Sequence, residues 1–180
     1  KTPRLITVSR FDKRKNHEKI IMTLRNLKQL YPNIVYICIG SGDEENNLKE
    51  LVKELDLETQ VMFFKNITND LKNALLAESD IFVMPSIIYK TSVEGFGIAY
   101  VEAAQHGVPS LGGRDGGASD AIDHNTTGLI CDGNDLEDIY SSLNSMIENK
   151  KYLEFGKNAK EYVSKFQWEK IFEKYRKILN

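Results

Sequence analysis

The sequence predicts an α/β domain built on a doubly wound parallel sheet. Three observations lead to this prediction. Short apolar runs alternate with longer amphipathic segments, loops rich in glycine or charge follow the runs, and the 180 residues suit one domain with a real core. Sheets of this kind bind ligands in the loops beyond the carboxyl ends of their strands, so functional residues are expected in those loops.

Five runs are expected to be strands because they are short and rich in β-branched or aromatic residues. They are residues 4–9 (RLITVS), 34–40 (IVYICIG), 61–64 (VMFF), 80–86 (DIFVMPS) and 107–112 (GVPSLG). Cys38 and Cys131 each lie in an apolar strand-like run and have no CxxC spacing. They are expected to be buried, reduced thiols.

Helices are expected between and after these runs. Residues 17–30 place Ile20, Ile21, Leu24, Leu27 and Leu30 on one face before Tyr31-Pro32, and residues 44–55 repeat this pattern. Gly107 with Pro109 two residues later is a helix stop signal. The remaining helices are expected near residues 70–77, 97–106, 136–149, 151–166 and 168–179.

The overall charge excludes some functions. With 24 Lys and Arg against 26 Asp and Glu, the net charge is −2, so broad capture of nucleic acid is not expected and an anion site must be local. No apolar run approaches the roughly 18–20 residues of a membrane span, and a secretory signal is not expected. A cytoplasmic location is expected. Because the chain starts at Lys1 and enters a strand within a few residues, it is expected to be part of a longer protein.

A cluster of cations follows the first expected strand. The loop SRFDKRKNH places Arg10, Lys13, Arg14 and Lys15 just before a helix. Cations beside exposed helix amides favour an anion site, and Arg10 and Lys15 are expected to be the inward pair. A solvated basic loop is the alternative.

The loops after the second and third expected strands carry weaker signals. In GSGDEEN, Gly40 and Gly42 flank Ser41 and would let a ligand or another backbone come close, although Asp43 and the next acids could simply begin a helix. In FFKNITND, Thr68 or Asn69 is expected to cap the next helix.

The stretch EGFGIAYVEAAQHGVPS, residues 94–110, carries the strongest signal. Glu94 and Glu102 bracket a turn with Gly95 and Gly97, after which helix amides suited to a phosphate are expected. A carboxylate holds vicinal hydroxyls well. A nucleotide sugar, with ribose at one acid and hexose at the other, would explain this pattern, whereas an amphipathic helix with two surface glutamates is the alternative.

A last glycine cluster, GGRDGGASDAI at residues 112–122, is expected to form a flexible, closely approached loop, with an ordinary surface loop as the alternative.

In this order, SRFDKRKNH, GSGDE, EGFGIAYVEAAQHGVP, GGASDAI and TTGLIC resemble the carboxyl-terminal lobe of a family 4 glycosyltransferase, which has the two-lobed GT-B architecture. The resemblance covers essentially the whole chain. It implies one Rossmann-like domain over residues 1–180 and an amino-terminal acceptor lobe that this chain lacks. It also implies a nucleoside-diphosphate sugar donor of the UDP or GDP type, retention of configuration and no required metal or other cofactor.

The resemblance further implies a glycan or lipid acceptor, held mostly by the missing lobe, through which the protein would meet the inner face of a membrane. The isolated lobe is expected to be inactive.

Roles for individual residues follow from the same resemblance. Arg10 and Lys15 would hold the diphosphate, Glu94 the sugar hydroxyls and Glu102 the ribose. Arg10, Lys15 and Glu94 would therefore act in catalysis. The remaining donor-binding residues implied are Gly40, Ser41, Gly42, Lys65, Asn66, Ile67, Gly95, Phe96, Gly97 and Ile98, with Lys65–Ile67 beside the base.

Some positions depart from the family pattern. Asn16 stands where a glycine often follows the loop lysine, Asp120 where a glutamate is usual, and His106 where a small residue is common. The scattered histidines, His17, His106 and His124, are expected to be structural.

The sequence leaves two other functions open. One is half of a nucleotide-sugar epimerase, and the other is a non-catalytic binding domain that keeps the fold. A dinucleotide dehydrogenase is disfavoured because GSGDEE follows the second strand and lacks the G-x-G-x-x-G spacing.

Overall fold

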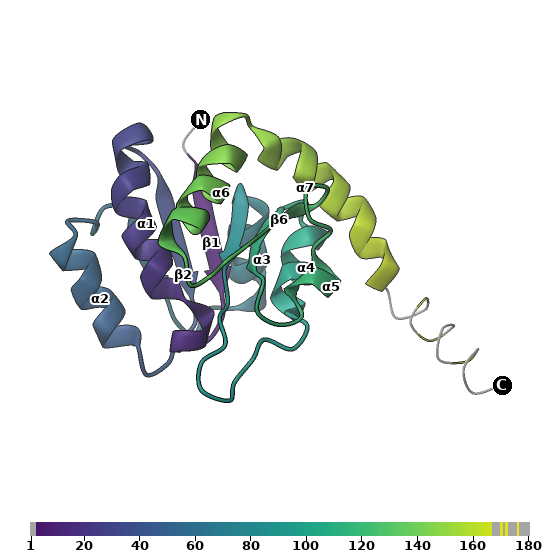
Figure 1. The fold of residues 1–180 in the computed structure, drawn as a ribbon, viewed down its shortest axis with the longest axis horizontal. Helices are drawn as coiled ribbons and strands as arrows, with labels where there is room; N and C mark the ends of the chain where they lie inside the picture. The colour runs from purple at the N-terminus through teal and green to yellow at the C-terminus, as the bar shows by residue number, and fades with distance from the viewer. Residues whose placement is uncertain (1–2, 167–169, 171, 173–175, 177–180) are drawn as a thin grey trace.

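The protein is built on a six-stranded sheet with the strand order β3-β2-β1-β4-β5-β6, in which every recorded strand pair is parallel. The computed structural model describes residues 3–166, 170, 172 and 176 (Figure 1). The strands are β1 (Arg4–Val8), β2 (Val35–Ile39), β3 (Val61–Phe64), β4 (Ile81–Met84), β5 (Ser110–Gly113) and β6 (Gly128–Cys131). The predicted doubly wound α/β class is confirmed.

Helices cover both faces of this sheet. They are α1 (His17–Leu30), α2 (Glu45–Glu54), α3 (Asn69–Ala77), α4 (Ile98–Gln105), α5 (Ala118–Ala121), α6 (Leu136–Glu148) and α7 (Lys151–Tyr162). Two short 3-10 helices, η1 (Lys13–Lys15) and η2 (Val163–Phe166), complete the described elements.

Two separate cores lie on the two faces of the sheet. On one face, Leu24 of α1 and Leu143 of α6 pack with Tyr36 and Val83, and all four side chains are fully buried. On the other face, Leu76 of α3 and Tyr100 of α4 pack with Phe82. Because each strand sends alternate side chains to opposite faces, the central strands are buried on both sides and their sequences are almost wholly apolar.

The strand order reverses direction at the centre of the sheet. β1 pairs with β2 on one side and with β4 on the other. The loops that leave the carboxyl ends of β1 and β4 therefore diverge to opposite faces of the sheet and open a crevice between them. In the sequence these two loops are SRFDKRKN and the segment that ends in EGFG.

Most predicted elements are confirmed, with small differences at their ends. Thr68 caps α3 by accepting a hydrogen bond from the Leu71 amide at 3.2 Å. Both cysteines are free and buried. The helix expected over residues 151–166 is α-helical only to Tyr162 and ends as η2. The helix predicted over residues 168–179 lies mostly outside the described residues.

Three short elements were not among those expected, namely η1, α5 and the edge strand β6, whose run around Cys131 is identified from the sequence only as strand-like. The glycine cluster at residues 112–122 was expected to be a loop throughout, but it contains α5, which is a single turn. A turn this short has too few residues for an amphipathic pattern to indicate it.

Candidate functional site

The cation loop after β1 is divided between two places. Lys15 donates a hydrogen bond to Oε2 of Glu94, and Nη1 of Arg14 lies 2.5 Å from the same oxygen. The Lys13 ammonium lies 3.6 Å from Oε2 of Glu44 instead. Arg10 is exposed and lines a cleft with Lys13, Arg14, Tyr89 and Ser92, together with the acids Asp12, Asp43 and Glu44. Among the described residues, Arg14 and Lys15 are thus the cations that meet Glu94.

Arg14, Lys15 and Glu94, called here the charge cluster, come from the two loops at the reversal point of the sheet. The loop after β1 supplies both cations and the loop after β4 supplies the acid, 80 residues further along the chain. The side chains are largely buried, with 17% of Arg14, 12% of Lys15 and 10% of Glu94 exposed. The Ile87 amide donates a hydrogen bond to the Arg14 carbonyl at 3.0 Å, which joins the two loops directly.

Glu94 is held in its charged form. Burial alone would raise the pKa of Glu94, but the hydrogen bond and charge of Lys15, together with Arg14, outweigh burial and lower the pKa below its usual value. The charge cluster therefore holds two cations and one carboxylate at neutral pH, and keeps one surplus positive charge at the switch point.

The start of α4 lies immediately after Glu94. Gly97 caps the helix in the left-handed conformation, with φ 77°, and a side chain there would overlap the Tyr100 ring. A side chain on Gly95 would meet only open space, and Gly95 is exposed. Gly97 is thus required by the fold, whereas the open space beside Gly95 leaves room for a ligand. The amides at the start of α4 supply partial positive charge beside the cluster.

Glu102 lies inside α4 and is paired with a cation of its own. Nζ of Lys72, on α3, is 3.1 Å from Oε1 of Glu102, and 38% of the Glu102 side chain is exposed. The two glutamates that bracket the glycine turn therefore belong to two separate ion pairs, Glu94 at the charge cluster and Glu102 against α3.

The GSG turn after β2 has a structural explanation for its glycines. A side chain on Gly40, where φ is 149°, would overlap the Ser9 carbonyl, and one on Gly42 would overlap the backbone of Phe11. The Phe11 amide also donates to the Ser41 carbonyl at 2.9 Å. Of the two possibilities that the sequence left open, close approach by another backbone is the one the structure displays.

The turn after β3 is mainly exposed. Lys65 pairs with Glu45 at 3.3 Å, Asn66 adopts a left-handed conformation with φ 53°, and Ile67 packs against the core beneath α3. The structure keeps these three residues at the carboxyl end of the sheet but brings none of them into contact with the charge cluster.

The glycine loop after β5 packs against the loop that carries Glu94. The Gly117 amide donates to the Glu94 carbonyl at 2.9 Å, and Glu94 and Gly116 form an isolated parallel bridge. Side chains on Gly116 or Gly117 would overlap the backbone of residues 94 and 95. This loop therefore supports the backbone of Glu94.

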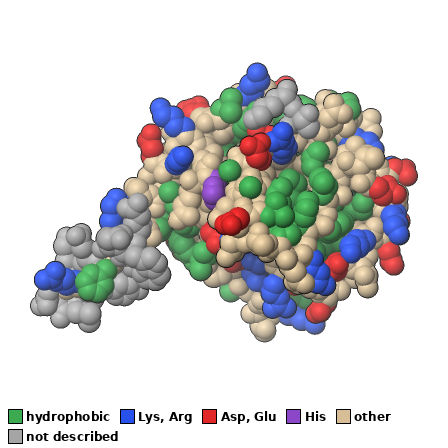
Figure 2. Space-filling view, turned by 180° about the vertical axis from the view of Figure 1, so that it is seen from behind, with side chains coloured by type: hydrophobic (Ala, Val, Ile, Leu, Met, Phe, Trp, Pro, Cys, Tyr) green, Lys and Arg blue, Asp and Glu red, His purple; other side chains and the backbone are tan. Residues whose placement is uncertain are grey.

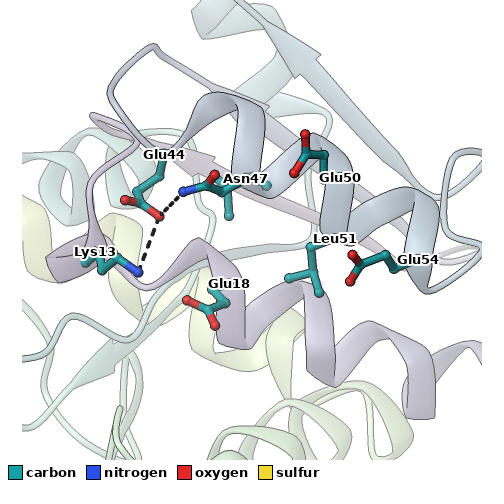
Figure 3. Close-up of a pocket in the computed structure, with 8 residues that line it drawn as sticks. Lys13, Glu18, Glu44, Asn47, Glu50, Leu51 and Glu54 are labelled. Atoms are coloured by element: carbon teal, nitrogen blue, oxygen red, sulfur yellow. Dashed lines mark hydrogen bonds and ion pairs between the residues drawn. The ribbon is translucent and has the colours of Figure 1, made fainter.

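A second groove, between α1 and α2, differs in charge from the site. Figure 3 shows Lys13 directed toward Glu44 at its mouth, with Glu18, Glu50 and Glu54 along its length. Because three of the four acids there lack a recorded cation, this groove would repel a diphosphate. Among the described residues, no group of three or more His, Cys, Asp and Glu side chains is arranged to hold a metal ion.

The histidines lie in structural positions. His17 is buried, with Nε2 at 2.9 Å from the Ser9 hydroxyl and Nδ1 at 2.8 Å from the Tyr36 hydroxyl. Burial, with a smaller effect from Lys15, lowers the pKa of His17 from 6.5 to about 3. His124 accepts a hydrogen bond from the Ile130 amide, and His106 ends α4.

Sequence reasoning missed the position of Arg14. It favoured Arg10 as the partner of Lys15 because Arg10 leaves the strand directly, but the turn of η1 brings Arg14 and Lys15 together onto Glu94. Asp12, which caps η1 by accepting a hydrogen bond from the Lys15 amide, is a signal in the sequence that could have indicated this turn.

On the face seen from behind in Figure 2, acidic and basic side chains are interspersed with hydrophobic ones, and neither sign of charge dominates that face. The positive charge at the switch point is thus local, as the net charge of −2 implied. Within the described part of the chain, no helix is long and apolar enough to cross a membrane.

Comparison with known proteins gives a consistent family. The family model described as glycosyl transferases group 1 matches residues 1–162. A GDP-mannose-dependent alpha-(1-6)-phosphatidylinositol monomannoside mannosyltransferase from Mycobacterium tuberculosis is 26% identical over 181 residues, covering 98% of this chain and 47% of the relative. The chain therefore spans about half the length of the curated relatives it matches.

Two solved structures share the fold. The pneumococcal O-GlcNAc transferase GtfA, solved with UDP and GlcNAc, has a TM-score of 0.85 at 18% identity and matches 97% of this chain and 35% of its own. HepE from Anabaena, solved with UDP and glucose, has a TM-score of 0.78 at 24% identity, covering 91% of this chain and 44% of its own.

Proposed function

Because the chain belongs to the group 1 glycosyl transferases, we propose that it is the carboxyl-terminal, donor-binding lobe of a family 4 enzyme. Residues 1–180 would form the Rossmann-like lobe, and a separate amino-terminal lobe would hold a glycan or lipid acceptor. The enzyme would transfer a hexose from a UDP or GDP sugar with retention of configuration. The observation that carries this proposal is the charge cluster at the reversal point of the sheet, beside the start of α4.

The chemistry of the proposed reaction suits this cluster. Cleavage of the bond between the sugar and the diphosphate leaves negative charge on the departing phosphate. Lys15, Arg14 and the first amides of α4 would stabilise that charge, with Arg10 approaching from the rim of the cleft. We propose that these groups do the work that a metal ion does in other transferases.

The two glutamates would hold the two ends of the donor. Glu94, with two oxygens that accept hydrogen bonds, would hold sugar hydroxyls, and Glu102 would hold the ribose hydroxyls. Phe96, Gly97 and Ile98 would offer backbone to the sugar and phosphate. Residues 65–67 would lie beside the base, and the turn at residues 40–42 would border the nucleotide.

Family membership favours the transferase over an epimerase half. The mycobacterial relative is named for GDP-mannose, and HepE, which shares the fold, was solved with UDP, so both support a nucleotide-sugar donor. A cytoplasmic location, with contact to the inner face of a membrane made by the other lobe, is part of the same proposal.

The proposal is tested by titrating UDP, GDP and ADP separately into this chain while recording two-dimensional amide NMR spectra. One nucleotide is expected to give saturable shifts in residues 94–99. Lys15→Ala should weaken its binding at least tenfold, because the diphosphate loses a charged hydrogen-bond donor, and a hydrogen bond to a charged group typically contributes about 1.5–3 kcal/mol. Lys13→Ala is the matched control, since Lys13 belongs to the same loop and lines the same cleft but pairs with Glu44 instead of Glu94.

Two outcomes would count against the proposal. Absence of shifts with all three nucleotides at millimolar concentration would favour a non-catalytic interaction domain. Equal loss of affinity in Lys15→Ala and Lys13→Ala would show that binding follows the general charge of the loop and not the charge cluster.

A further inference from the structure

Asn16 directly follows Lys15 of the charge cluster, and its backbone conformation alone does not account for its side chain. It adopts the left-handed conformation, with φ 64° and ψ 31°, between η1 and α1. Asparagine tolerates this conformation better than most residues, but glycine tolerates it best. Backbone conformation alone therefore does not explain why a side-chain amide is present here.

The Asn16 side chain is buried, with 4% exposed, and both of its hydrogen bonds reach distant loops. Nδ2 donates to the Pro85 carbonyl at 2.9 Å, just beyond β4, and to the Gly133 carbonyl at 2.7 Å, just beyond β6. One amide group thus fixes the loop after β1 to the ends of two other strands, across 69 and 117 residues of sequence.

These two loops are themselves in close contact. A side chain on Gly133 would overlap the Pro85 carbonyl, and the Lys19 ammonium donates to the neighbouring Asn134 carbonyl at 2.5 Å. Asn16 therefore binds where the loops after β4 and β6 meet. The same β4 loop continues to Glu94, the partner of both cations.

Arg14 has few other anchors that would orient it. Its Nε atom is buried without a recorded hydrogen-bond partner in the described structure, and among described contacts its guanidinium meets Glu94 through Nη1. Apart from this ion pair, the position of Arg14 depends on the backbone of its loop, which is held by the Ile87 amide, by the Asp12 cap on the Lys15 amide and by the Asn16 side chain.

We propose that Asn16 is a positioning residue, whose side-chain amide holds Arg14 and Lys15 against Glu94 by fixing their loop to the ends of β4 and β6. Its importance for donor binding rests on the proposed function, whereas its effect on the charge cluster does not. A glycine at this position keeps the backbone conformation and loses the two hydrogen bonds, so it isolates the contribution of the amide.

The test compares Asn16→Gly and Asn16→Asp with Thr23→Val. The aspartate variant keeps the shape of the side chain but replaces Nδ2, which donates to the Pro85 and Gly133 carbonyls, with an oxygen that accepts. The control removes a buried hydrogen bond on α1, from the Thr23 hydroxyl to the Lys19 carbonyl at 2.8 Å, away from the charge cluster. All variants are first compared by thermal unfolding.

The deciding measurement is the titration of the Glu94 carboxyl, followed by carbon NMR. In Asn16→Gly the pKa of Glu94 is expected to rise toward its ordinary value, because the cations no longer lie against it, and in Thr23→Val it should stay low. Asn16→Asp should also raise this pKa, but its added acid repels Glu94 directly, so the glycine variant decides. The affinity of the Asn16 variants is then measured for the nucleotide, UDP or GDP, that binds the unmodified chain. This affinity should fall about tenfold. In the control it should change less than about twofold.

An unchanged Glu94 titration in Asn16→Gly would overturn the inference. So would loss of the fold in both Asn16 variants while Thr23→Val folds, because the amide would then be a requirement for folding and not for positioning. If the unmodified chain binds neither nucleotide, the proposed function fails, and the Glu94 titration still decides the role of Asn16.

Discussion

Gly95 and Gly97, two residues apart, should respond in opposite ways to the same substitution. Gly97 has φ 77°, and an added Cβ would overlap the Tyr100 ring, whereas an added Cβ on Gly95 meets nothing within 4 Å. Gly97→Ala therefore combines the cost of a left-handed alanine, about 1–2 kcal/mol, with that of overpacking, about 1–3 kcal/mol. The sum is roughly 3 kcal/mol.

Gly95→Ala carries neither cost. Gly95 lies outside the left-handed region, and replacing such a glycine with alanine lowers the entropy of the unfolded chain, which stabilises by about 0.4–1 kcal/mol. For a domain of this size, each kcal/mol shifts Tm by about 2–4 °C. Gly97→Ala should therefore melt roughly 6–12 °C below the unmodified chain, and Gly95→Ala within about 4 °C of it.

The assay is thermal unfolding followed by circular dichroism, with urea unfolding to give the free energy directly. The reasoning is refuted if both variants lose similar stability, or if Gly97→Ala melts normally. The same pair also tests the site. Although Gly95→Ala is expected to be stable, it should weaken binding of a nucleotide sugar about tenfold, since its methyl group enters the open space beside Glu94.

Three further predictions concern single residues. Because the pKa of His17 is lowered from 6.5 to about 3, only the unfolded chain takes up its proton between these values. The contribution of His17 to the free energy of unfolding should therefore be fully present above pH 6.5 and fall by about 1.4 kcal/mol per pH unit below it, until about pH 3. His17→Gln should flatten this slope in urea unfolding at pH 7, 6 and 5, and parallel curves would contradict the explanation. Glu94→Gln removes the acid that neutralises Arg14 and Lys15, so the bare nucleoside diphosphate should bind about fivefold more tightly by calorimetry at low salt; weaker binding would show that Glu94 is needed to order the cations. Thr68→Ala removes the N-cap of α3 and should lower the free energy of unfolding by about 1 kcal/mol. The control is Asn46→Ala, at an exposed position within α2 that is not a helix cap, and it should leave the free energy of unfolding unchanged.

Much of the architecture was predictable because its signals are local. Leu24 and Leu27 recur at helical spacing, VYICI is short and β-branched, and Thr68 lies where a cap belongs. These features depend on neighbours within a few residues, which the sequence displays directly. The presence of Glu94 and Lys15 in the candidate site was predictable for a related reason, since both follow expected strands at the carboxyl edge of a parallel sheet.

The partners within the site were not predictable in the same way. Sequence reasoning paired Arg10 with Lys15, whereas η1 brings Arg14 to Glu94. It left the glycines at 40 and 42 open to a ligand, whereas the backbone of residues 9–11 occupies their space. It noted Asn16 only as a departure from a family pattern, whereas its amide joins three loops.

By itself, then, the sequence determined the α/β class, the elements and the edge of the sheet at which function should lie, because each follows from short-range periodicity and capping. Only the tertiary structure decided that β1 lies beside β4, that Glu94 takes two cations from a loop 80 residues earlier, and that Asn16 holds this loop in place. The physical reason is that such contacts depend on strand order and on packing across the sheet, and no property of one segment fixes what another segment places against it.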